Sequence, residues 1–251
     1  MSKEADVKEE RRVLVTGGTG STGAGIVREL ASIEGLDVWF QYHGQAEAAA
    51  ALERECGVTG FALDLSKRFE LPRRDFDILV NSAGVLLTKT LAHEVTEDEL
   101  VYTIAVNLLA PFRMCQACLP YMMERRYGRI VNIGSIYAER GCAENSSYNV
   151  SKHGLLGLTR SLAKEYATYG IAVNQIDPSA VEGDMMNRIA AGNVARGRSG
   201  SSDEYLKGVR AAIPAGRLAA PQDIAQGVVY LIQQSGFVTG VALPIDGGVS
   251  C

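Results

Sequence analysis

Short apolar runs alternate with amphipathic stretches along most of the chain. The apolar runs are near-continuous and end in small or polar residues, which is typical of strands buried on both faces of a sheet. They lie at residues 12–16, 38–40, 60–63, 77–80, 129–133, 171–176 and 241–245. Apolar residues at helical spacing fill the intervals, at residues 24–33, 46–55, 97–125, 147–169 and 223–234. We expect the longest helix to be kinked at Pro111 and to close near Pro120.

Strands that alternate with helices over short links imply parallel pairing with right-handed crossovers. The pattern predicts an α/β fold, a single doubly wound parallel sheet of the Rossmann type with helices on both faces. No internal repeat or break in composition divides the chain, so we expect one domain over residues 12–251 after a polar tail at residues 1–11. The Gly- and Ser-rich stretch 192–202 predicts a flexible loop.

Composition narrows the class of protein. Of 251 residues 47% are hydrophobic, which is ordinary for a globular chain. The net charge is −4 and the basic residues do not cluster, which disfavours a nucleic-acid-binding protein. The apolar runs fall short of the roughly 18 residues that span a bilayer, so no membrane segment is expected. Five cysteines, an odd number, predict reduced thiols and a cytoplasmic location.

A glycine motif stands between the first strand and the first helix. Gly17 lets the chain turn off the strand, Gly20 lets backbone approach a pyrophosphate, and Gly23 lets the helix pack close to the sheet. Free backbone N–H groups at the start of the helix would then bind the phosphates. Because a strand precedes the motif and a helix follows it, a dinucleotide site is favoured over a plain glycine-rich turn.

Two further polar positions follow later strands. Asp64 ends the third strand, where it could accept a hydrogen bond from an adenine amino group. The small residues of Asn81-Ser82-Ala83-Gly84 end the fourth, where they would let a ribose lie against the backbone. Either could simply make a turn. Together they mark the crevice at the carboxyl ends of the strands where doubly wound sheets bind ligands.

The segment after the second strand bears on the choice of cofactor. A carboxylate about 20 residues beyond the glycines usually binds the ribose 2′-hydroxyl of NAD. Here residues 41–44 contain no acid, and Asp37 lies at the wrong end of the strand. NADP(H) is therefore favoured over NAD(H), with His43 and the hydroxyls of Thr19 and Tyr42 as candidate contacts for a 2′-phosphate.

Tyr148 and Lys152 are four residues apart on a predicted helix and therefore share a face. An exposed Tyr/Lys pair is common, but a nearby ammonium also stabilises a phenolate and lowers the phenol pKa. A lowered pKa would suit a general acid or base near neutrality. Ser135 follows the fifth strand, where its hydroxyl could bind the same substrate oxygen.

These elements in this order resemble the short-chain dehydrogenase/reductase family, in its single-domain, 3-oxoacyl-reductase-like branch. The resemblance runs from about residue 12 to residue 248 and also includes Asn107, Pro178 and Asp246-Gly247-Gly248. It implies that Tyr148 transfers the proton, that Lys152 lowers its pKa and holds the nicotinamide ribose, and that Ser135 polarises the carbonyl. It also implies that Asn107 holds a water on the proton-relay path.

The sequence thus predicts an NAD(P)(H)-dependent oxidoreductase that interconverts a ketone and a secondary alcohol. A 3-oxoacyl-type ketoreductase and a tailoring reductase of secondary metabolism both fit, and a non-catalytic NAD(P)-binding sensor or scaffold is the alternative. No metal site is expected. The predicted catalytic residues are Asn107, Ser135, Tyr148 and Lys152. The predicted cofactor contacts are Gly17, Thr19, Gly20, Ser21, Thr22, Gly23, Tyr42, His43, Asp64, Leu65, Asn81, Ala83, Gly84, Tyr148, Lys152, Pro178 and Val181.

The chain departs from the family pattern at several positions. Ser21 and Ser179 replace usual glycines, and Gly183 stands where a threonine often contacts the carboxamide. The stretch from Asp64 to Asn81 is short, so the helix normally found there is expected to be truncated.

The resemblance places a substrate lid at about residues 184–213. Its four arginines are Arg188, Arg196, Arg198 and Arg210. A solvated loop is the simpler interpretation, and a lid that binds an acidic substrate is the alternative. The substrate is expected to be a small carbonyl or alcohol compound. The apolar helices at 105–121 and 155–166 predict a homo-oligomer, which the resemblance extends to a tetramer or dimer.

Overall fold

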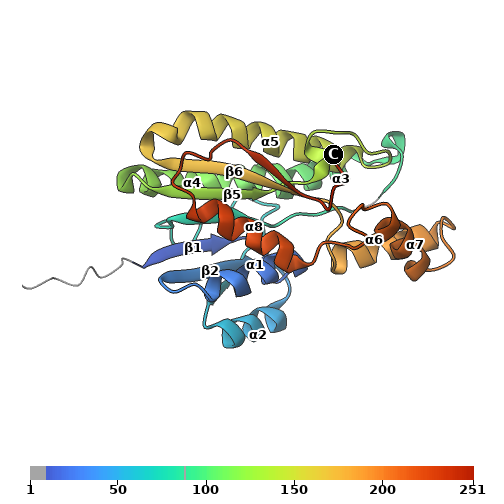
Figure 1. Ribbon diagram of the computed structural model, residues 1–251, viewed down its shortest axis with the longest axis horizontal. Coiled ribbons are helices and arrows are strands. Elements are labelled where there is room, and N and C mark those ends of the chain that lie inside the picture. Colours follow the sequence, from blue (N-terminus) through green and yellow to red (C-terminus); the bar gives the residue numbers. More distant parts are fainter. Residues whose placement is uncertain (1–9, 88) are drawn as a thin grey trace, which may run out of the picture.

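The computed structural model describes residues 10–87 and 89–251, so most of the predicted polar tail lies outside the described residues. The described strands form a seven-stranded parallel sheet in the order β3-β2-β1-β4-β5-β6-β7 (Figure 1). Their bounds are β1 Arg11–Val15, β2 Leu36–Tyr42, β3 Thr59–Ala62, β4 Ile78–Asn81, β5 Gly128–Ile133, β6 Ile171–Pro178 and β7 Ala242–Ile245. The predicted doubly wound fold is confirmed.

Helices cover both faces of the sheet, as Figure 1 shows. One face carries α1 (Ser21–Ala31), α2 (Ala46–Cys56) and α8 (Pro221–Gln233). The other carries α4 (Ala110–Arg125) and α5 (Ser146–Tyr166), with α3 (Glu97–Ile104) packed against α5.

Alternation along β1 shows why the strands are apolar throughout. Val13 and Val15 enter the core on the α1 side, while Leu14 enters the core on the α4 side. Successive side chains of a strand point to opposite faces, so a strand covered on both faces needs apolar residues at every position.

The helical run at residues 97–125 differs from the prediction. Its regular pattern is interrupted by a π-helical turn at Ala105–Leu109, before Pro111, which lies in the first turn of α4. The helix does not close at Pro120 but continues to Arg125, because Cys118 and Met122 bury the opposite face in the core. By length and composition alone this run could cross a membrane, contrary to the sequence expectation, but its apolar residues pack on the sheet.

The segment 184–213, predicted as a lid and called the lid below, is more ordered than its composition suggests. It consists of α6 (Asp184–Ala195) and α7 (Ser202–Ala211), so the predicted loop at 192–202 is reduced to the turn at residues 196–201. Ala190 and Asn193 anchor α6 by burial, and Ser201 caps α7 by accepting a hydrogen bond from the Glu204 N–H at 3.1 Å. Between β3 and β4, residues 63–77 contain no helix at all, where a truncated helix was expected.

Candidate active site

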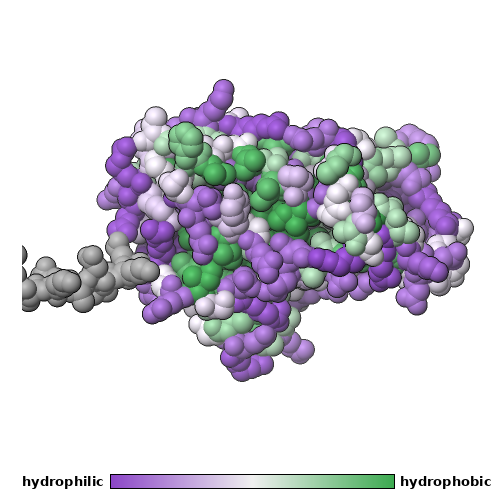
Figure 2. Space-filling model, viewed as in Figure 1, coloured by the Kyte–Doolittle hydropathy of each residue, from purple (hydrophilic) through white to green (hydrophobic). Residues whose placement is uncertain are grey.

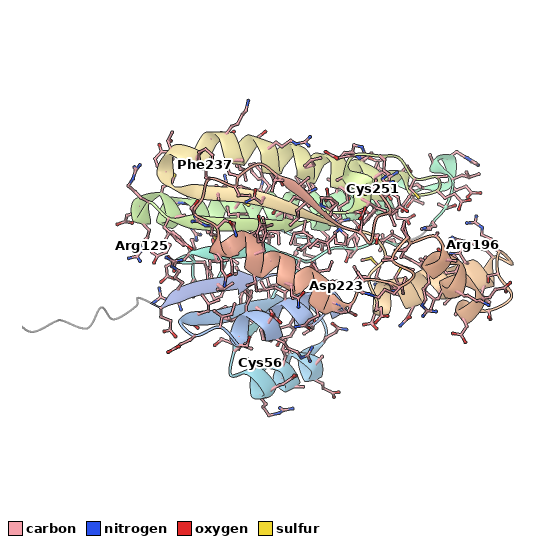
Figure 3. All side chains as sticks on the ribbon, viewed as in Figure 1. Cys56, Arg125, Arg196, Asp223, Phe237 and Cys251 are labelled. Carbon is pink, nitrogen blue, oxygen red and sulfur yellow. The ribbon has the colours of Figure 1, made fainter. Side chains whose placement is uncertain are left out.

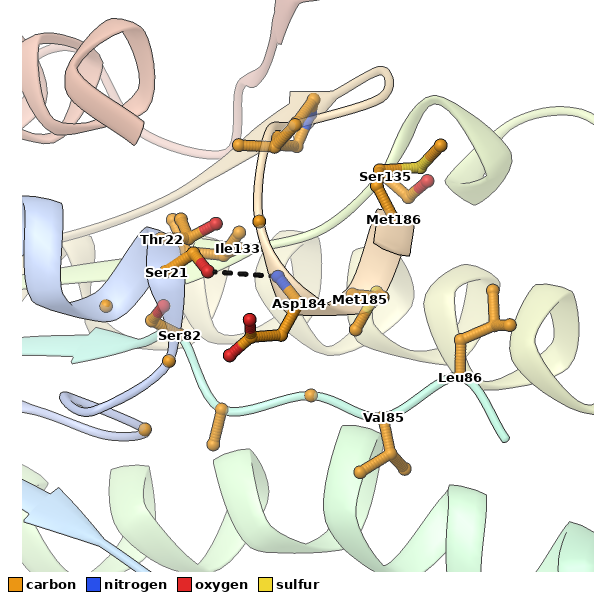
Figure 4. A pocket seen from close by; sticks show the side chains of 18 of the residues that line it. Ser21, Thr22, Ser82, Val85, Leu86, Ile133, Ser135, Asp184, Met185 and Met186 are labelled. Atoms are coloured by element: carbon orange, nitrogen blue, oxygen red, sulfur yellow. Dashed lines mark hydrogen bonds between the residues drawn. The ribbon is translucent and has the colours of Figure 1, made fainter. Parts of the chain in front are cut away.

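A cavity of about 630 Å³ opens at the carboxyl ends of the strands, between the sheet and the lid (Figure 4). It brings together most of the residues singled out in the sequence. These are Gly17, Thr19, Gly20, Ser21, Thr22, Gly23, His43, Asp64, Leu65, Ala83, Gly84, Ser135, Tyr148, Lys152, Pro178 and Val181. Tyr42, Asn81 and Asn107 do not line it.

The glycine turn is shaped to receive an anion. Gly17 has φ +67°, and a Cβ there would lie 2.8 Å from the Cα of Ala83, so only glycine lets the two loops approach. α1 starts at Ser21 after Gly20, which offers no side-chain cap, and its first turn carries no acidic residue. The free N–H groups of this turn therefore fit the pyrophosphate of a dinucleotide.

Gln41 fixes the glycine turn, a role that the sequence interpretation missed. Its Oε1 accepts a hydrogen bond from the Gly17 N–H at 2.9 Å, and its Nε2 donates to the Leu63 carbonyl at 2.6 Å. The signal was a polar residue inside an apolar strand, since such a residue needs partners when it is buried.

Asp64, which follows Leu63 and lines the cavity, is held as a carboxylate. Its Oδ1 accepts hydrogen bonds from the Ser66 hydroxyl at 2.6 Å and from the Ser66 N–H at 2.9 Å, and these bonds lower the Asp64 pKa. Lys67 lies 3.4 Å from Oδ2, a cation near the predicted adenosine end that sequence spacing did not reveal. His43 lines the same part of the cavity.

Two predicted cofactor contacts have other surroundings. The Tyr42 ring packs against Phe40 with centroids 6.1 Å apart, on the α1 side of the sheet. The Asn81 side chain is buried and donates to Oδ1 of Asn132 at 2.8 Å. Both side chains therefore support the walls instead of facing the cavity.

Two of the departures from the family pattern explain each other. Gly183 precedes α6 with φ +134°, and a Cβ there would lie 2.0 Å from Oγ and 2.3 Å from Cβ of Ser21. The Ser21 hydroxyl also accepts a hydrogen bond from the Asp184 N–H at 3.2 Å (Figure 4). Ser21 thus occupies the space of a side chain at position 183 and joins the phosphate turn to the lid.

The predicted catalytic side chains meet on one wall of the cavity. Ser135 begins a short 3-10 turn after β5, and its hydroxyl lies near enough to the Tyr148 hydroxyl to lower the Tyr148 pKa. Tyr148 and Lys152 share one face of α5, with the Lys152 amine 5.5 Å from the centre of the Tyr148 ring. Lys152 is only 4% exposed, and its Nζ donates to the Ile133 carbonyl at 2.8 Å.

The expectation that Tyr148 has a lowered pKa is wrong for this structure. Burial of the hydroxyl raises the pKa of Tyr148 to about 12, despite the opposing effect of the nearby Ser135 hydroxyl. Burial also lowers the pKa of Lys152 to about 8, so its amine holds a proton less firmly than an exposed lysine does. Tyr148 is therefore a neutral phenol near pH 7, the form that donates a proton.

Asn107 lies in the π-helical turn, and its side chain makes three hydrogen bonds. Its Oδ1 accepts from the Val85 N–H at 2.8 Å, and its Nδ2 donates to the Val85 carbonyl at 2.9 Å and to the Ser151 hydroxyl at 3.1 Å. The side chain holds the cavity wall after β4, and its Oδ1 keeps a second lone pair, so a role in holding a relay water stays a prediction.

The lid also lines the cavity with apolar side chains, which no sequence motif predicted. Its apolar lining residues are Met185, Met186, Ile189, Tyr205 and Val209. Of the four arginines only Arg188 lines the cavity, and Lys89 joins it from the segment after β4.

Arg196 and Arg198 fasten the lid instead of facing a substrate. Arg198 pairs with the Glu144 carboxylate, its Nη2 lying 2.8 Å from Oε1, and Arg196 donates to the Lys89 carbonyl. Figure 3 places Arg196 at the end of the lid away from the sheet. The anion-binding role considered for these two side chains is therefore not supported.

The cysteines carry no chemistry in this site. Cys115 and Cys118 are at most 1% exposed, and burial raises the pKa of Cys115 to about 12. All five cysteines are free thiols. Across residues 10–87 and 89–251, no group of three His, Cys, Asp or Glu side chains is placed to hold a metal ion.

The fold and the cavity define a dinucleotide-dependent oxidoreductase, and comparison with known proteins agrees. The family described as enoyl-(acyl carrier protein) reductase matches residues 18–250. An acetoacetyl-CoA reductase of Rhizobium meliloti is 35% identical over 248 residues, 95% of this chain and 98% of the relative. The 3-oxoacyl-[acyl-carrier-protein] reductase FabG of Haemophilus influenzae is 32% identical, over 94% of this chain and 96% of the relative.

A solved structure gives the same result in three dimensions. A single-residue variant of actinorhodin polyketide ketoreductase, solved with NADPH, has a TM-score of 0.88 and is 30% identical, over 98% of this chain and 99% of that chain. The chain belongs to the short-chain dehydrogenase/reductase family. It is an enzyme that acts on the CH–OH/C=O pair with NAD(P), and the sensor alternative is not favoured.

Proposed function

We propose that this enzyme reduces the ketone of a 3-oxoacyl thioester or a related polyketide-type substrate to a secondary alcohol with NADPH. The observation that carries the proposal is that Ser135, Tyr148 and the buried Lys152 all line a cavity that also contains the glycine turn, with the Lys152 amine 5.5 Å from the centre of the Tyr148 ring. The names of the similar proteins favour the 3-oxoacyl class.

The roles follow from the charge states of the side chains. NADPH, when bound, supplies a hydride to the carbonyl carbon. The Tyr148 phenol donates its proton to the carbonyl oxygen as that oxygen gains charge. The Ser135 hydroxyl donates a second hydrogen bond to the same oxygen and orients it. The Lys152 ammonium stabilises the phenolate that Tyr148 becomes.

A preference for NADPH over NADH rests on the rim of the cavity. His43 lines the part where an NAD-specific enzyme would carry a carboxylate, and Gln41 is committed to the glycine turn. Lys67, beside Asp64, adds positive charge near the same rim. These side chains suit a 2′-phosphate better than a 2′-hydroxyl.

An acidic substrate is supported by the two cations of the substrate side. Lys89 and Arg188 come from the segment after β4 and from α6, and both line the cavity. The phosphates of a coenzyme A or phosphopantetheine thioester could bind them while the acyl chain contacts the methionines of the lid.

We further infer a homo-oligomer, a tetramer or a dimer, that works in the cytoplasm. Exposed apolar side chains lie on the outer helices, with Val101 57%, Phe112 47% and Val150 54% exposed, and Phe237 is 96% exposed. Figure 2 shows apolar residues also gathered near the middle of one face. Such surfaces are typical of subunit contacts. We also propose that residues 12–251 form one domain with residues 184–213 as its lid.

A cofactor and substrate panel tests the proposal. The purified enzyme is assayed with NADPH and with NADH against three ketones: acetoacetyl-CoA, the acetoacetyl thioester of N-acetylcysteamine, and a neutral cyclic ketone. Light scattering gives the oligomeric state. We expect kcat/KM with NADPH to exceed that with NADH at least tenfold, and acetoacetyl-CoA to be preferred over the thioester that lacks phosphates. No turnover of any ketone with either cofactor would overturn the proposal.

A further inference from the structure

A carboxylate lies directly behind the proposed catalytic wall. Asp177 stands at the end of β6, where it shares a face with Gln175 and Val173, and it is only 5% exposed. Its Oδ1 accepts hydrogen bonds from the Ser135 N–H at 2.9 Å and from Nε2 of Gln175 at 2.8 Å. A Cβ at Gly134 would lie 2.1 Å from that oxygen, so the chain passes close against the carboxylate just before Ser135.

The charged and titratable groups around Asp177 come from two directions. Lys152 and Tyr148 of α5 lie on one side, and the Asp177 charge opposes the effect of burial on Lys152. On the other side a second cavity of about 330 Å³ is lined by Asp177, Glu139 and Arg140. Among the charged groups that act on Lys152, Asp177 is the one that favours the ammonium.

We propose that Asp177 is a positioning residue of this enzyme, which as a carboxylate fixes the backbone of Ser135 and keeps the neighbouring Lys152 protonated. The proposal rests on the roles assigned above to Ser135, Tyr148 and Lys152. Asp177 does not touch the substrate. It acts by holding the backbone that carries the Ser135 hydroxyl and by placing a negative charge near the buried Lys152 amine, whose hydrogen-bond partner is the Ile133 carbonyl.

The charge state of Asp177 makes the proposal measurable. Burial raises the pKa of Asp177 to about 6, despite its bonds to Gln175 and Ser135 and the nearby Lys152. The carboxylate is therefore present above about pH 6 and is progressively protonated below it. We expect activity to fall on this acid side, because a protonated Asp177 accepts the hydrogen bond from the Ser135 N–H more weakly and so holds Ser135 less firmly.

The experiment compares Asp177→Asn, which keeps an acceptor oxygen but loses the charge, with Asp177→Ala, which loses both. Asp98→Asn, an exposed acid of α3, is the matched control. Profiles of kcat and kcat/KM are measured from pH 5 to pH 9.5 with NADPH and the best ketone. The wild type and the control should lose activity below about pH 6, whereas Asp177→Asn should show no such acid limb.

The size of the loss separates the two contributions of Asp177. At pH 7 we expect kcat to fall about tenfold in Asp177→Asn and about 100-fold in Asp177→Ala, with KM changed less than about threefold, as for a group that acts on general acid catalysis. An Asp177→Asn profile that keeps the wild-type acid limb would overturn the proposal, because a merely structural residue would leave that limb in place.

A readout without turnover keeps this test distinct from that of the proposed function. The Lys152 pKa is followed by NMR of protein labelled with ¹³Cε-lysine, and assigned with Lys152→Arg. Asp177→Asn should lower the Lys152 pKa by about one unit, a tenfold change in the protonation equilibrium. An unchanged Lys152 pKa in a folded variant contradicts the proposal even if no ketone substrate is found. Circular dichroism establishes folding, and the Asn variant is used alone if the Ala variant does not fold.

Discussion

The floor and the lid of the cavity are stabilised by different kinds of contact, buried hydrogen bonds in the floor and mainly exposed contacts in the lid. The floor comes from the ends of β5 and β6 and from α5, and its buried side chains Lys152, Gln175 and Asp177 are hydrogen-bonded to one another or to the backbone. The lid comes from α6 and α7; α7 contains no buried residue, and the lid is fastened by exposed contacts such as Arg198 with Glu144. From this comparison we expect the rigid region to carry out the chemistry and the more exposed region to determine the choice of substrate.

A chain of buried hydrogen bonds explains the rigidity of the floor. Asn81 donates to Asn132 at 2.8 Å, and Asn132 donates to Thr159 at 2.9 Å, which links β4 and β5 to α5. Thr159 lies 3.2 Å from Oε1 of Gln175, whose Nε2 donates to Asp177. Because leaving one buried partner unpaired costs about 1–3 kcal/mol, the chain resists displacement of any one member.

The largest expected effect concerns the buried amine of the floor. Lys152→Ala should lower kcat/KM about 100-fold or more, because the variant loses the cation that stabilises the Tyr148 phenolate. Steady-state kinetics at pH 7 measures this loss. Lys164→Ala, an exposed lysine of the same helix, is the control and should remain within about twofold of wild type. If Lys152→Ala lowered kcat/KM no more than Lys164→Ala does, the buried lysine of the floor would matter no more than an exposed lysine of the same helix.

The junction of floor and lid should respond next most strongly. Gly183→Ala places a Cβ against Ser21 and forces an alanine to φ +134°, so NADPH should bind about tenfold more weakly, a loss of about 1.4 kcal/mol. Isothermal titration calorimetry measures the affinity. Adding Ser21→Gly should recover the steric part but not the backbone strain. If the double variant binds no better than Gly183→Ala, Ser21 and Gly183 are not a complementary pair.

The rim of the cofactor site offers a moderate effect. His43→Asp should repel a 2′-phosphate and bind a 2′-hydroxyl, shifting the NADPH/NADH ratio of kcat/KM toward NADH by about tenfold. Parallel assays with the two cofactors show this shift. His93→Asp, at an exposed position far along the chain, should leave the ratio unchanged. An unaltered ratio in His43→Asp would place the 2′ group elsewhere.

The smallest effect is expected at the lid fastening. Arg198→Ala and Glu144→Gln each remove one exposed ion pair, worth about 0.2–1 kcal/mol, so KM should change less than about fivefold while kcat stays within twofold. The double variant should equal either single variant, because both remove the same contact. Additive losses, or a large fall in kcat, would show that these residues contact the substrate after all.

Much of the fold and of the floor could be predicted because they depend on local patterns. Apolar runs indicated the strands, and the spacing of Tyr148 and Lys152 on one helix placed both in the cavity. The pKa of Tyr148 could not be predicted, since it depends on how deeply the hydroxyl is buried, which no spacing reports. The role of Asp177 was missed because its partners, Ser135 and Lys152, come from other elements.

The lid was the weakest part of the prediction. Its glycines and serines favoured a loop from residue 192, but the burial of Ala190 and Asn193 outweighed the low helix propensity of Gly192 and Asn193 at the end of α6. Its arginines could be counted from the sequence, whereas their partners, Glu144 and the Lys89 carbonyl, lie in loops far along the chain. Tertiary contacts of this kind have no signature in local composition.

The central claim is that the neutral Tyr148 phenol donates the proton in ketone reduction. A single-turnover experiment, with enzyme in excess over NADPH, follows NADPH absorbance at pH 7 in wild type and in Tyr148→Phe, after calorimetry has established that both bind NADPH with similar affinity. The account predicts that the Phe variant oxidises NADPH at least about 100-fold more slowly. A Phe variant that reduces the ketone at a rate close to wild type would contradict it.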